Sequence, residues 1–190
     1  TDGANTEYFN AGLNSTVLEG AQLSGGSRAV ELGLITHKGT LSLARKMLLG
    51  ALLVTLLLLY NSFLITGEIA NAQNALILGV VGGLLGYFYT ARPIRLVSRR
   101  GLGEVAIFLA FGPILTLGAL FAISSNTVEL FSTEFYNAIY LGIPFGFLTT
   151  NILYINQYPD TVSDATTGKN HLIVTLGKKN ARWGYLLLLS

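Results

Sequence analysis

Four long stretches without a charged residue restrict this 190-residue chain to one broad class of fold. The first, residues 47–66, is long enough to cross the hydrocarbon core of a bilayer, which needs about 20 residues at 1.5 Å per residue. In addition, 51% of the residues are hydrophobic and only 12% are charged, which is unusual for a soluble domain. We therefore expect an all-α, polytopic transmembrane helical bundle. Its predicted spans are residues 47–66, 74–90, 105–123 and 135–155, with a fifth beginning at 183.

Two of these predicted spans contain a proline. Pro113 lies inside the third and Pro144 inside the fourth. A proline within a helix removes a backbone hydrogen bond and favours a kink, which membrane helices tolerate where a neighbour or a cavity satisfies the backbone. Two kinked helices would leave room for a cavity in the bundle. The chain has no cysteine, so disulfides and thiolate metal sites are excluded.

The basic residues are segregated along the chain, and this predicts the orientation of the bundle. All twelve precede the first span or lie in the segments between the second and third and between the fourth and fifth. The two loops on the other side, about residues 67–73 and 124–134, contain no basic residue, and their only charged residues are Glu68, Glu129 and Glu134. Because cytoplasmic loops carry the excess of Lys and Arg, the long polar segments are predicted to face the cytoplasm.

A pair of carboxylates follows the fourth span directly, in the segment of residues 156–169. Asp160 and Asp164 are four residues apart, so on a helix they would share one face. Two like charges repel unless a cation lies between them, and Mg²⁺ commonly takes one or two protein carboxylates together with substrate phosphate. Lys169, one turn further on, is suited to the phosphate. The alternative is a helix end whose acidic side chains simply face solvent.

A second polar segment, residues 87–104, lies on the same predicted membrane face. Arg92 and Arg95 flank Pro93, which stiffens the backbone, and they suit an anionic ligand. For Arg99 and Arg100, attraction to anionic lipid is the favoured explanation. Glu104 would be favourable at a helix N-terminus, so capping of the third span is its predicted role. A ligand that matches paired carboxylates and basic groups above apolar helices has an anionic head and an apolar tail, as polyprenyl diphosphate does.

These segments together resemble a known family. The run Asn156-Gln157-Tyr158-Pro159-Asp160, with Asp164 and Gly168-Lys169, resembles the second aspartate-rich motif of the UbiA superfamily of intramembrane prenyltransferases. Residues 89–96 (Tyr-Thr-Ala-Arg-Pro-Ile-Arg-Leu), with 101–104 and 111–113, resemble the branch that prenylates 1,4-dihydroxy-2-naphthoate in menaquinone synthesis. Residues 25–28 (Gly-Gly-Ser-Arg) are similar to a loop of the same branch.

The resemblance implies a fold and a reaction. The family has nine spanning helices, so residues 1–190 would form a single UbiA-type domain truncated at both ends, with the first aspartate motif upstream of Thr1. The implied reaction is Mg²⁺-dependent transfer of a polyprenyl group from its diphosphate to an aromatic ring, coupled in this branch to loss of the ring's carboxylate. The enzyme would lie in the cell membrane with its active site facing the cytoplasm, and no nucleic acid partner is expected.

The resemblance also assigns residue roles. It implies Asp160 and Asp164 as catalytic metal ligands with Asn156 in support, and Lys169 as a catalytic and diphosphate-binding group. The substrate-binding residues would be Arg28, Tyr89, Arg92 and Arg95.

Two alternatives to this function stay open on the sequence. The same fold could serve another acceptor, such as 4-hydroxybenzoate, homogentisate or a porphyrin-derived ring. A membrane transporter with acidic residues along an ion path is less favoured, because it predicts charges at mid-membrane depth and the four spans have none. Neither His37 nor His171 is given a catalytic role, and Trp183 is expected to be an interfacial anchor.

Overall fold

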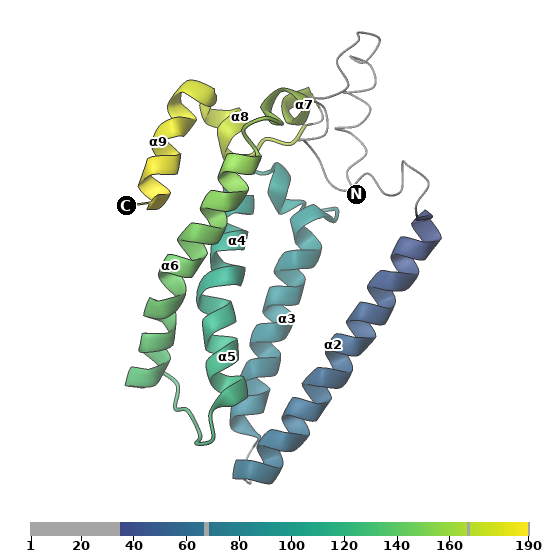
Figure 1. The fold of residues 1–190 in the computed structure, drawn as a ribbon, viewed down its shortest axis with the longest axis vertical. Helices are drawn as coiled ribbons and strands as arrows, with labels where there is room; N and C mark the ends of the chain where they lie inside the picture. Colours follow the sequence, from purple (N-terminus) through teal and green to yellow (C-terminus); the bar gives the residue numbers. More distant parts are fainter. Residues whose placement is uncertain (1–34, 67–68, 167, 190) are drawn as a thin grey trace.

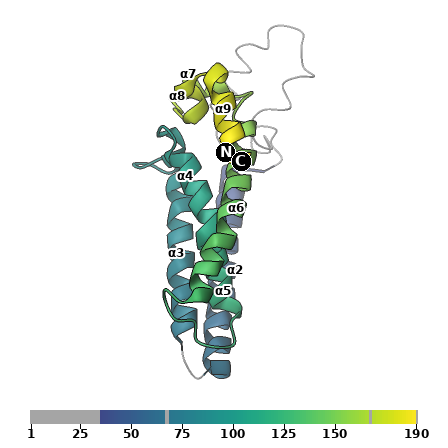
Figure 2. The same cartoon turned by 90° about the vertical axis from the view of Figure 1, so that its left-hand side faces the viewer.

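The computed structural model describes residues 35–66, 69–166 and 168–189, and every regular element among them is helical (Figure 1). Long helices run side by side and three short ones lie together at one end, here called the polar end (Figures 1 and 2). The elements in chain order are α2 (His37–Thr66), α3 (Ala70–Thr90), η2 (Leu96–Ser98), α4 (Leu102–Leu109), the π-helical η3 (Ala110–Ile114), α5 (Leu115–Ile123), α6 (Thr133–Asn156), α7 (Thr161–Thr166), α8 (Leu172–Leu176) and α9 (Lys178–Leu189).

Four of the helices in the described part of the chain are long and apolar enough to cross a membrane. They are Lys38–Ile65, Ala70–Thr90, Leu102–Ile123 and Thr133–Asn156. Large apolar side chains cover their outer faces, including Leu48 and Leu57 of α2, which are 72% and 65% exposed. Such a surface is stable in hydrocarbon and unsuited to water. The chain is therefore an integral membrane protein, as its sequence predicts.

The two prolines behave differently. The third span is interrupted at Gly112, whose backbone angles (φ −103°, ψ −111°) are not helical, and a π-helical segment surrounds Pro113. In contrast, α6 remains one helix from Thr133 to Asn156 with Pro144 inside it. Gly112 precedes the first proline and has no Cβ to restrict its backbone, whereas the β-branched Ile143 precedes the second. The predicted kink at Pro113 is confirmed by this interruption, whereas α6 is continuous across Pro144.

Close contact between η3 and α6 depends on glycine. A Cβ added to Gly142 would lie 2.8 Å from both Gly112 C and Pro113 Cα, and one added to Gly146 would lie 2.7 Å from the Phe108 carbonyl oxygen. Gly142 and Gly146 are four residues apart, the spacing by which small residues let membrane helices approach. These two helices therefore pack backbone against backbone.

At the end opposite the polar end, Asn71 joins α3 to the loop before α6. Its Nδ2 donates to the Asn126 carbonyl (2.8 Å), and its Oδ1 accepts the Val128 N–H (2.9 Å). The side chain is buried, and beside it Leu117, Phe121 and Ala138 form an apolar core. Both polar groups of the amide are thus satisfied where water is excluded.

The polar end is built on the last turn of α6. Tyr154 is fully buried there with Ile173 and Ala181, and its hydroxyl donates to the Ala181 carbonyl (2.9 Å). Through this contact α9 packs against α6. On the exposed side of α9, Arg182 lies 5.1 Å from the ring centroid of Trp183, a cation–π contact.

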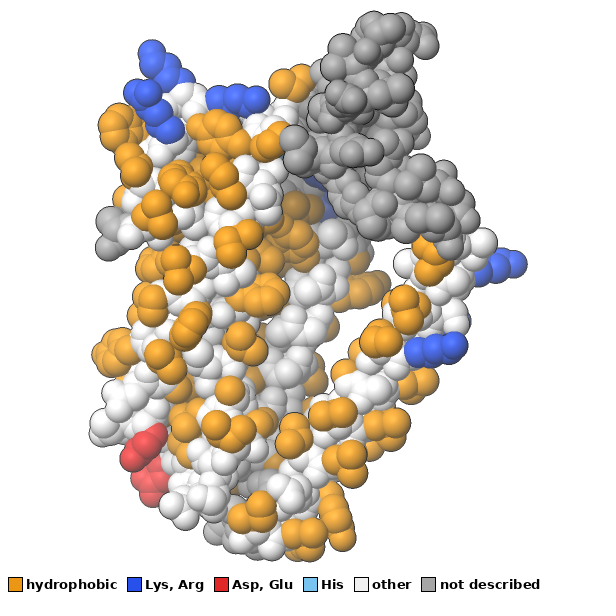
Figure 3. All heavy atoms as spheres, in the orientation of Figure 1, with side chains coloured by type: hydrophobic (Ala, Val, Ile, Leu, Met, Phe, Trp, Pro, Cys, Tyr) orange, Lys and Arg blue, Asp and Glu red, His pale blue; other side chains and the backbone are white. Residues whose placement is uncertain are grey.

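Charge is distributed unevenly over the described surface. Figure 3 shows blue Lys and Arg side chains toward the polar end and on the first turns of α2, whereas the red acidic patch lies at the opposite end. Glu129 and Glu134 belong to the loop before α6 and to its first turn. The segregation seen along the sequence is therefore also a segregation in space.

Candidate functional site

The candidate site lies in residues 157–171, here called the aspartate loop, which leaves the end of α6. The Asp164 N–H donates to the Asp160 carbonyl (2.8 Å), the bond of one helical turn, so the two carboxylates are presented from successive turns. Thr161 Oγ1 donates back to the Tyr158 carbonyl (2.7 Å) and fixes the entry of α7. The predicted spacing of Asp160 and Asp164 by one turn is present in the structure.

Asp164 is buried between two nitrogen-bearing side chains. Lys169 Nζ lies 3.2 Å from its Oδ1, and His171 Nε2 lies 3.2 Å from its Oδ2. All three side chains are buried, His171 with only 1% of its surface exposed. Burial alone would raise the pKa of Asp164, but the His171 hydrogen bond and the charge of Lys169 outweigh it and hold the pKa below its ordinary value. Asp164 is therefore an ionised carboxylate at neutral pH.

The second segment predicted from the sequence lies against the aspartate loop. Residues 91–101, here called the arginine loop, form a parallel β-bridge with it between Arg99 and Asn170. Arg99 also donates from Nε to the Ile94 carbonyl (2.6 Å) and from an Nη to the Pro93 carbonyl (3.4 Å). The Arg99 guanidinium thus stabilises the fold of its own loop, and its attraction to anionic lipid stays a prediction.

The other predicted residues of this loop differ in exposure. Arg92 is exposed and Arg95 half-buried, and the backbone of Arg95 is left-handed (φ 46°) at the start of η2. Tyr89 is half-buried, and its ring lies 3.5 Å from the position of a Cβ on Gly103. The structure thus places Tyr89 and both arginines at the polar end, in the segment that adjoins the aspartate loop. Arg28 lies outside the described residues.

Two buried groups in this region, His171 and Gln157, were not singled out as site residues from the sequence. His171 was expected to make only a loop contact, yet it flanks Asp164. Gln157 is 7% exposed, and its Oε1 has no hydrogen-bond partner among the described residues, whereas the predicted ligand Asn156 is exposed. The only sequence signal for either was closeness to the aspartates. Glu104 has an unpredicted contact as well. It lies in the first turn of α4, where a carboxylate is favourable as predicted, but its Oε1 also accepts the N–H of Leu172, the residue directly after the aspartate loop (3.0 Å).

The donors in the aspartate loop fit the magnesium ion that the sequence implies. Asp160 and Asp164 supply carboxylate oxygens one turn apart, and the unpartnered amide oxygen of Gln157 is a third hard donor nearby in the chain. No group of three or more His, Cys, Asp or Glu side chains arranged as metal ligands occurs within the described ranges. The set is thus sparse, which suits an ion that completes its shell with phosphate and water.

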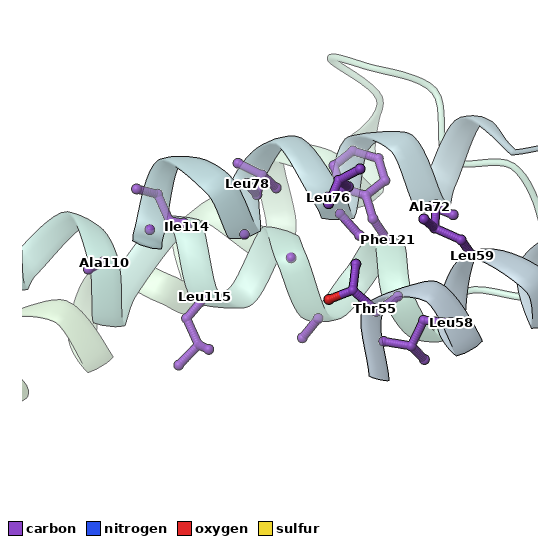
Figure 4. A pocket seen from close by; sticks show the side chains of 16 residues that line it. Thr55, Leu58, Leu59, Ala72, Leu76, Leu78, Ala110, Ile114, Leu115 and Phe121 are labelled. Atoms are coloured by element: carbon purple, nitrogen blue, oxygen red, sulfur yellow. The ribbon is translucent and has the colours of Figure 1, made fainter. Parts of the chain in front are cut away.

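An apolar pocket of about 380 Å³ lies deeper in the bundle, between α2, α3 and the η3–α5 segment (Figure 4). Leu58, Leu76, Ile114 and Phe121 contribute to its wall, together with small residues such as Gly82. Gly82 precedes Tyr89 on α3 by about two turns, roughly 10 Å. The pocket is therefore separate from the charged site, and its lining is mostly hydrocarbon, with the Thr55 hydroxyl as a polar group (Figure 4).

Comparison with known proteins gives a family and several relatives. Residues 36–190 match the model of the UbiA prenyltransferase family. The UbiA prenyltransferase domain-containing protein 1 of Dictyostelium discoideum is 33% identical over 60% of this chain. The chloroplastic 2-carboxy-1,4-naphthoquinone phytyltransferase of Arabidopsis thaliana is 32% identical over 63% of it, and the 1,4-dihydroxy-2-naphthoate octaprenyltransferase of Escherichia coli is 28% identical over 85%. No solved structure gives a significant match.

The matches cover only part of each relative. The chain spans 32% of the Dictyostelium protein, 33% of the Arabidopsis protein and 49% of the Escherichia coli protein. The region that matches the family model, residues 36–190, includes the spanning helices, the arginine loop and the aspartate loop.

Proposed function

Since this chain belongs to the UbiA prenyltransferase family, we propose that the protein transfers the polyprenyl group of a polyprenyl diphosphate to 1,4-dihydroxy-2-naphthoate. The observation that carries the proposal is the buried Asp164 with Lys169 and His171, at the polar end of an apolar helical bundle. A substrate that uses both parts needs an anionic head for the charged site and a long hydrocarbon tail for the bundle. A polyprenyl diphosphate has both.

The acceptor is inferred from the relatives. The names of the Arabidopsis and Escherichia coli proteins specify a naphthoquinone or naphthoate ring with a carboxyl group. Arg92 and Arg95, whose guanidinium groups stay charged at any physiological pH, would pair with such a carboxylate or with the diphosphate. The other aromatic acceptors considered above share the prenyl donor but have no counterpart among these names.

In the proposed reaction the bond between the allylic carbon and the diphosphate oxygen breaks, and the diphosphate leaves with the electron pair. The ring carbon that bears the carboxylate forms the new carbon–carbon bond, and CO₂ leaves while its bonding electrons return to the ring. Bound Mg²⁺, held by Asp160 and Asp164, would neutralise charge on the leaving diphosphate. Lys169 orients Asp164 and adds positive charge beside the leaving group. The apolar helices exclude water, which would otherwise capture the allylic cation.

The side of the membrane on which the reaction takes place is inferred from charge. Lys and Arg gather at the polar end of the described structure, and cytoplasmic segments carry such an excess. We therefore infer that the charged site faces the cytoplasm from the cell membrane, where both the soluble acceptor and the membrane-bound donor can reach it.

The test compares aspartate variants of the full-length protein in membrane vesicles with labelled polyprenyl diphosphate, the naphthoate and Mg²⁺. Asp164→Ala and Asp160→Ala should each lower the rate at least about 100-fold, as loss of a group that stabilises transition-state charge does. Glu134→Ala removes an acid at the opposite end and should leave the rate unchanged. Equal rates in all three variants would refute the assigned site.

A further inference from the structure

Glu104 occupies an unusual position for a carboxylate. It lies in the first turn of α4 with only 6% of its surface exposed, and the N-cap of that helix is Gly101. Its Oε1 accepts the Leu172 N–H at 3.0 Å, a bond between residues 68 positions apart. Burying a carboxylate costs free energy unless a hydrogen bond compensates for it. Because the compensating bond here joins distant parts of the chain, we infer that the side chain holds these two segments together.

The group that Glu104 holds adjoins the candidate site. Leu172 is the first residue of α8, and the N-cap residue, His171, makes no side-chain cap bond. The first N–H groups of a helix have no partner within it, and Glu104 supplies one from another span. One peptide unit away, His171 lies 3.2 Å from the Asp164 carboxylate. The bond therefore fixes the end of the aspartate loop that carries His171 and Lys169.

Two further contacts tie the same segment to the start of α4. Asn170 forms the β-bridge with Arg99, and Leu172 Cδ1 lies 3.5 Å from the Cβ position of Gly101. Gly103 lets this region pack closely, since a Cβ there would lie 3.0 Å from Val97 Cα. The start of α4 thus supports residues 170–172 on several sides, and Glu104 provides the polar contact.

We propose that Glu104 is a positioning residue, which sets the geometry of Asp164, Lys169 and His171 by accepting the Leu172 N–H. The proposal rests on the proposed function, since the geometry matters for the transfer reaction. In this role Glu104 acts only as a hydrogen-bond acceptor, and its negative charge is not required. A direct catalytic or metal-binding role is the competing explanation, because Glu104 Oε2 has no hydrogen-bond partner in the described part of the chain.

Variants of Glu104 separate these two roles. In Glu104→Gln the amide oxygen can still accept the Leu172 N–H, so transfer should stay within about threefold of wild type. Glu104→Ala should lose about 10- to 100-fold, the usual loss when a group that orients an active residue is removed. A matched Glu129→Ala, in the loop at the opposite end, should change nothing. If Glu104→Gln is as impaired as Glu104→Ala, the charge is required and the positioning role is wrong.

A change at the donor side tests the same bond without altering Glu104. Leu172→Pro removes the N–H at the first helical position, where proline is well tolerated, and the extended backbone of His171 (φ −65°, ψ 174°) suits a residue before proline. Leu172→Ala keeps the N–H and is the control for the lost side chain. The proline variant should match Glu104→Ala, and the alanine variant should be clearly more active. Equal activity of the two Leu172 variants would overturn the proposal.

Hydrogen exchange gives a readout that does not need the reaction. In wild type and Glu104→Gln the backbone amides of residues 168–176 should be protected, and in Glu104→Ala they should exchange about tenfold faster. Unchanged exchange in Glu104→Ala would refute the contact itself. If wild type shows the protection but transfers no prenyl group, the proposed function fails while the positioning contact stands.

Discussion

Packing between α6 and η3 predicts that Gly142 cannot be replaced even by alanine. A Cβ at this position would lie 2.5 Å from Thr116 Oγ1 and 2.8 Å from Gly112 C and Pro113 Cα. The threonine can rotate away, but the backbone atoms can move only if the helices separate. Gly142→Ala should therefore weaken the α6–η3 interface.

The size of the effect follows from the same contacts. Forcing one methyl group into a packed interface costs about 1–3 kcal/mol. Replacing glycine by alanine within a helix also stabilises the helix by about 1 kcal/mol, because alanine has the higher helix propensity. Gly83→Ala is the matched control, because Gly83 is in the helix α3 with nothing within 4 Å of its Cβ position. The propensity gain is common to both variants, so their difference, about 2 kcal/mol, reports the overpacking alone.

The assay is thermal unfolding of the purified protein in detergent micelles, followed by circular dichroism. For a chain of this length a difference of 2 kcal/mol corresponds to roughly 4–8 °C in the unfolding midpoint. Gly142→Ala should unfold that far below Gly83→Ala, and Gly142→Leu lower still. Equal midpoints for the two alanine variants would refute the close packing of α6 on η3.

Three further perturbations test other contacts. Lys169→Met leaves the buried Asp164 carboxylate without its ammonium partner and should destabilise the protein by about 3 kcal/mol. Lys178→Met, at an exposed position, should leave the stability unchanged in the same unfolding assay. Equal effects of the two substitutions would contradict the buried ion pair. Asn71→Ala leaves the Val128 N–H without its acceptor, so added protease should cleave residues 124–132 faster than in the control variant Gln73→Ala. Equal cleavage of the two variants would refute the hydrogen bonds of Asn71 to this loop. Because folding lowers the pKa of Asp164, its ionisation contributes stability that is present above the unfolded pKa, about 3.9, and is lost as the pH falls through the folded pKa. With a chelator present to remove metal ions, the unfolding midpoint of the wild type should therefore fall more steeply below about pH 4 than that of Asp164→Asn. Equal slopes would contradict the lowered pKa.

The spanning helices could be predicted because one property, the absence of charge over about 20 residues, determines whether a segment can cross a bilayer. Their ends were less predictable. The charge-free run began at residue 47, but α2 begins at His37, since a helix can continue past the membrane with Lys38 and Lys46 at its polar end. The fifth predicted span corresponds to α9, which begins at Lys178, five residues before Trp183, and is not among the four candidate spans in the described residues.

In the candidate site, the local spacing was predictable and the long-range contacts were not. Asp160, Asp164 and Lys169 could be proposed together because they lie within about two turns of each other. The burial of His171 and the Glu104 bond depend on how α4 meets the aspartate loop, which no spacing along the chain encodes. Glu104 had a sufficient local explanation as an acidic residue at the start of a helix, so nothing in the sequence pointed to a distant partner.

The reaction itself is the most direct test of this account. The full-length protein in membrane vesicles would be supplied with unlabelled polyprenyl diphosphate and naphthoate labelled in its carboxyl carbon, with and without Mg²⁺, and the product identified by mass spectrometry. We expect a prenylated naphthalene ring and one labelled CO₂ released per ring, only when Mg²⁺ is present. If a parallel set of other aromatic acceptors shows prenylation of one of these in place of the naphthoate, the assigned acceptor is wrong. Absence of any prenylated product from folded protein would contradict the proposed function.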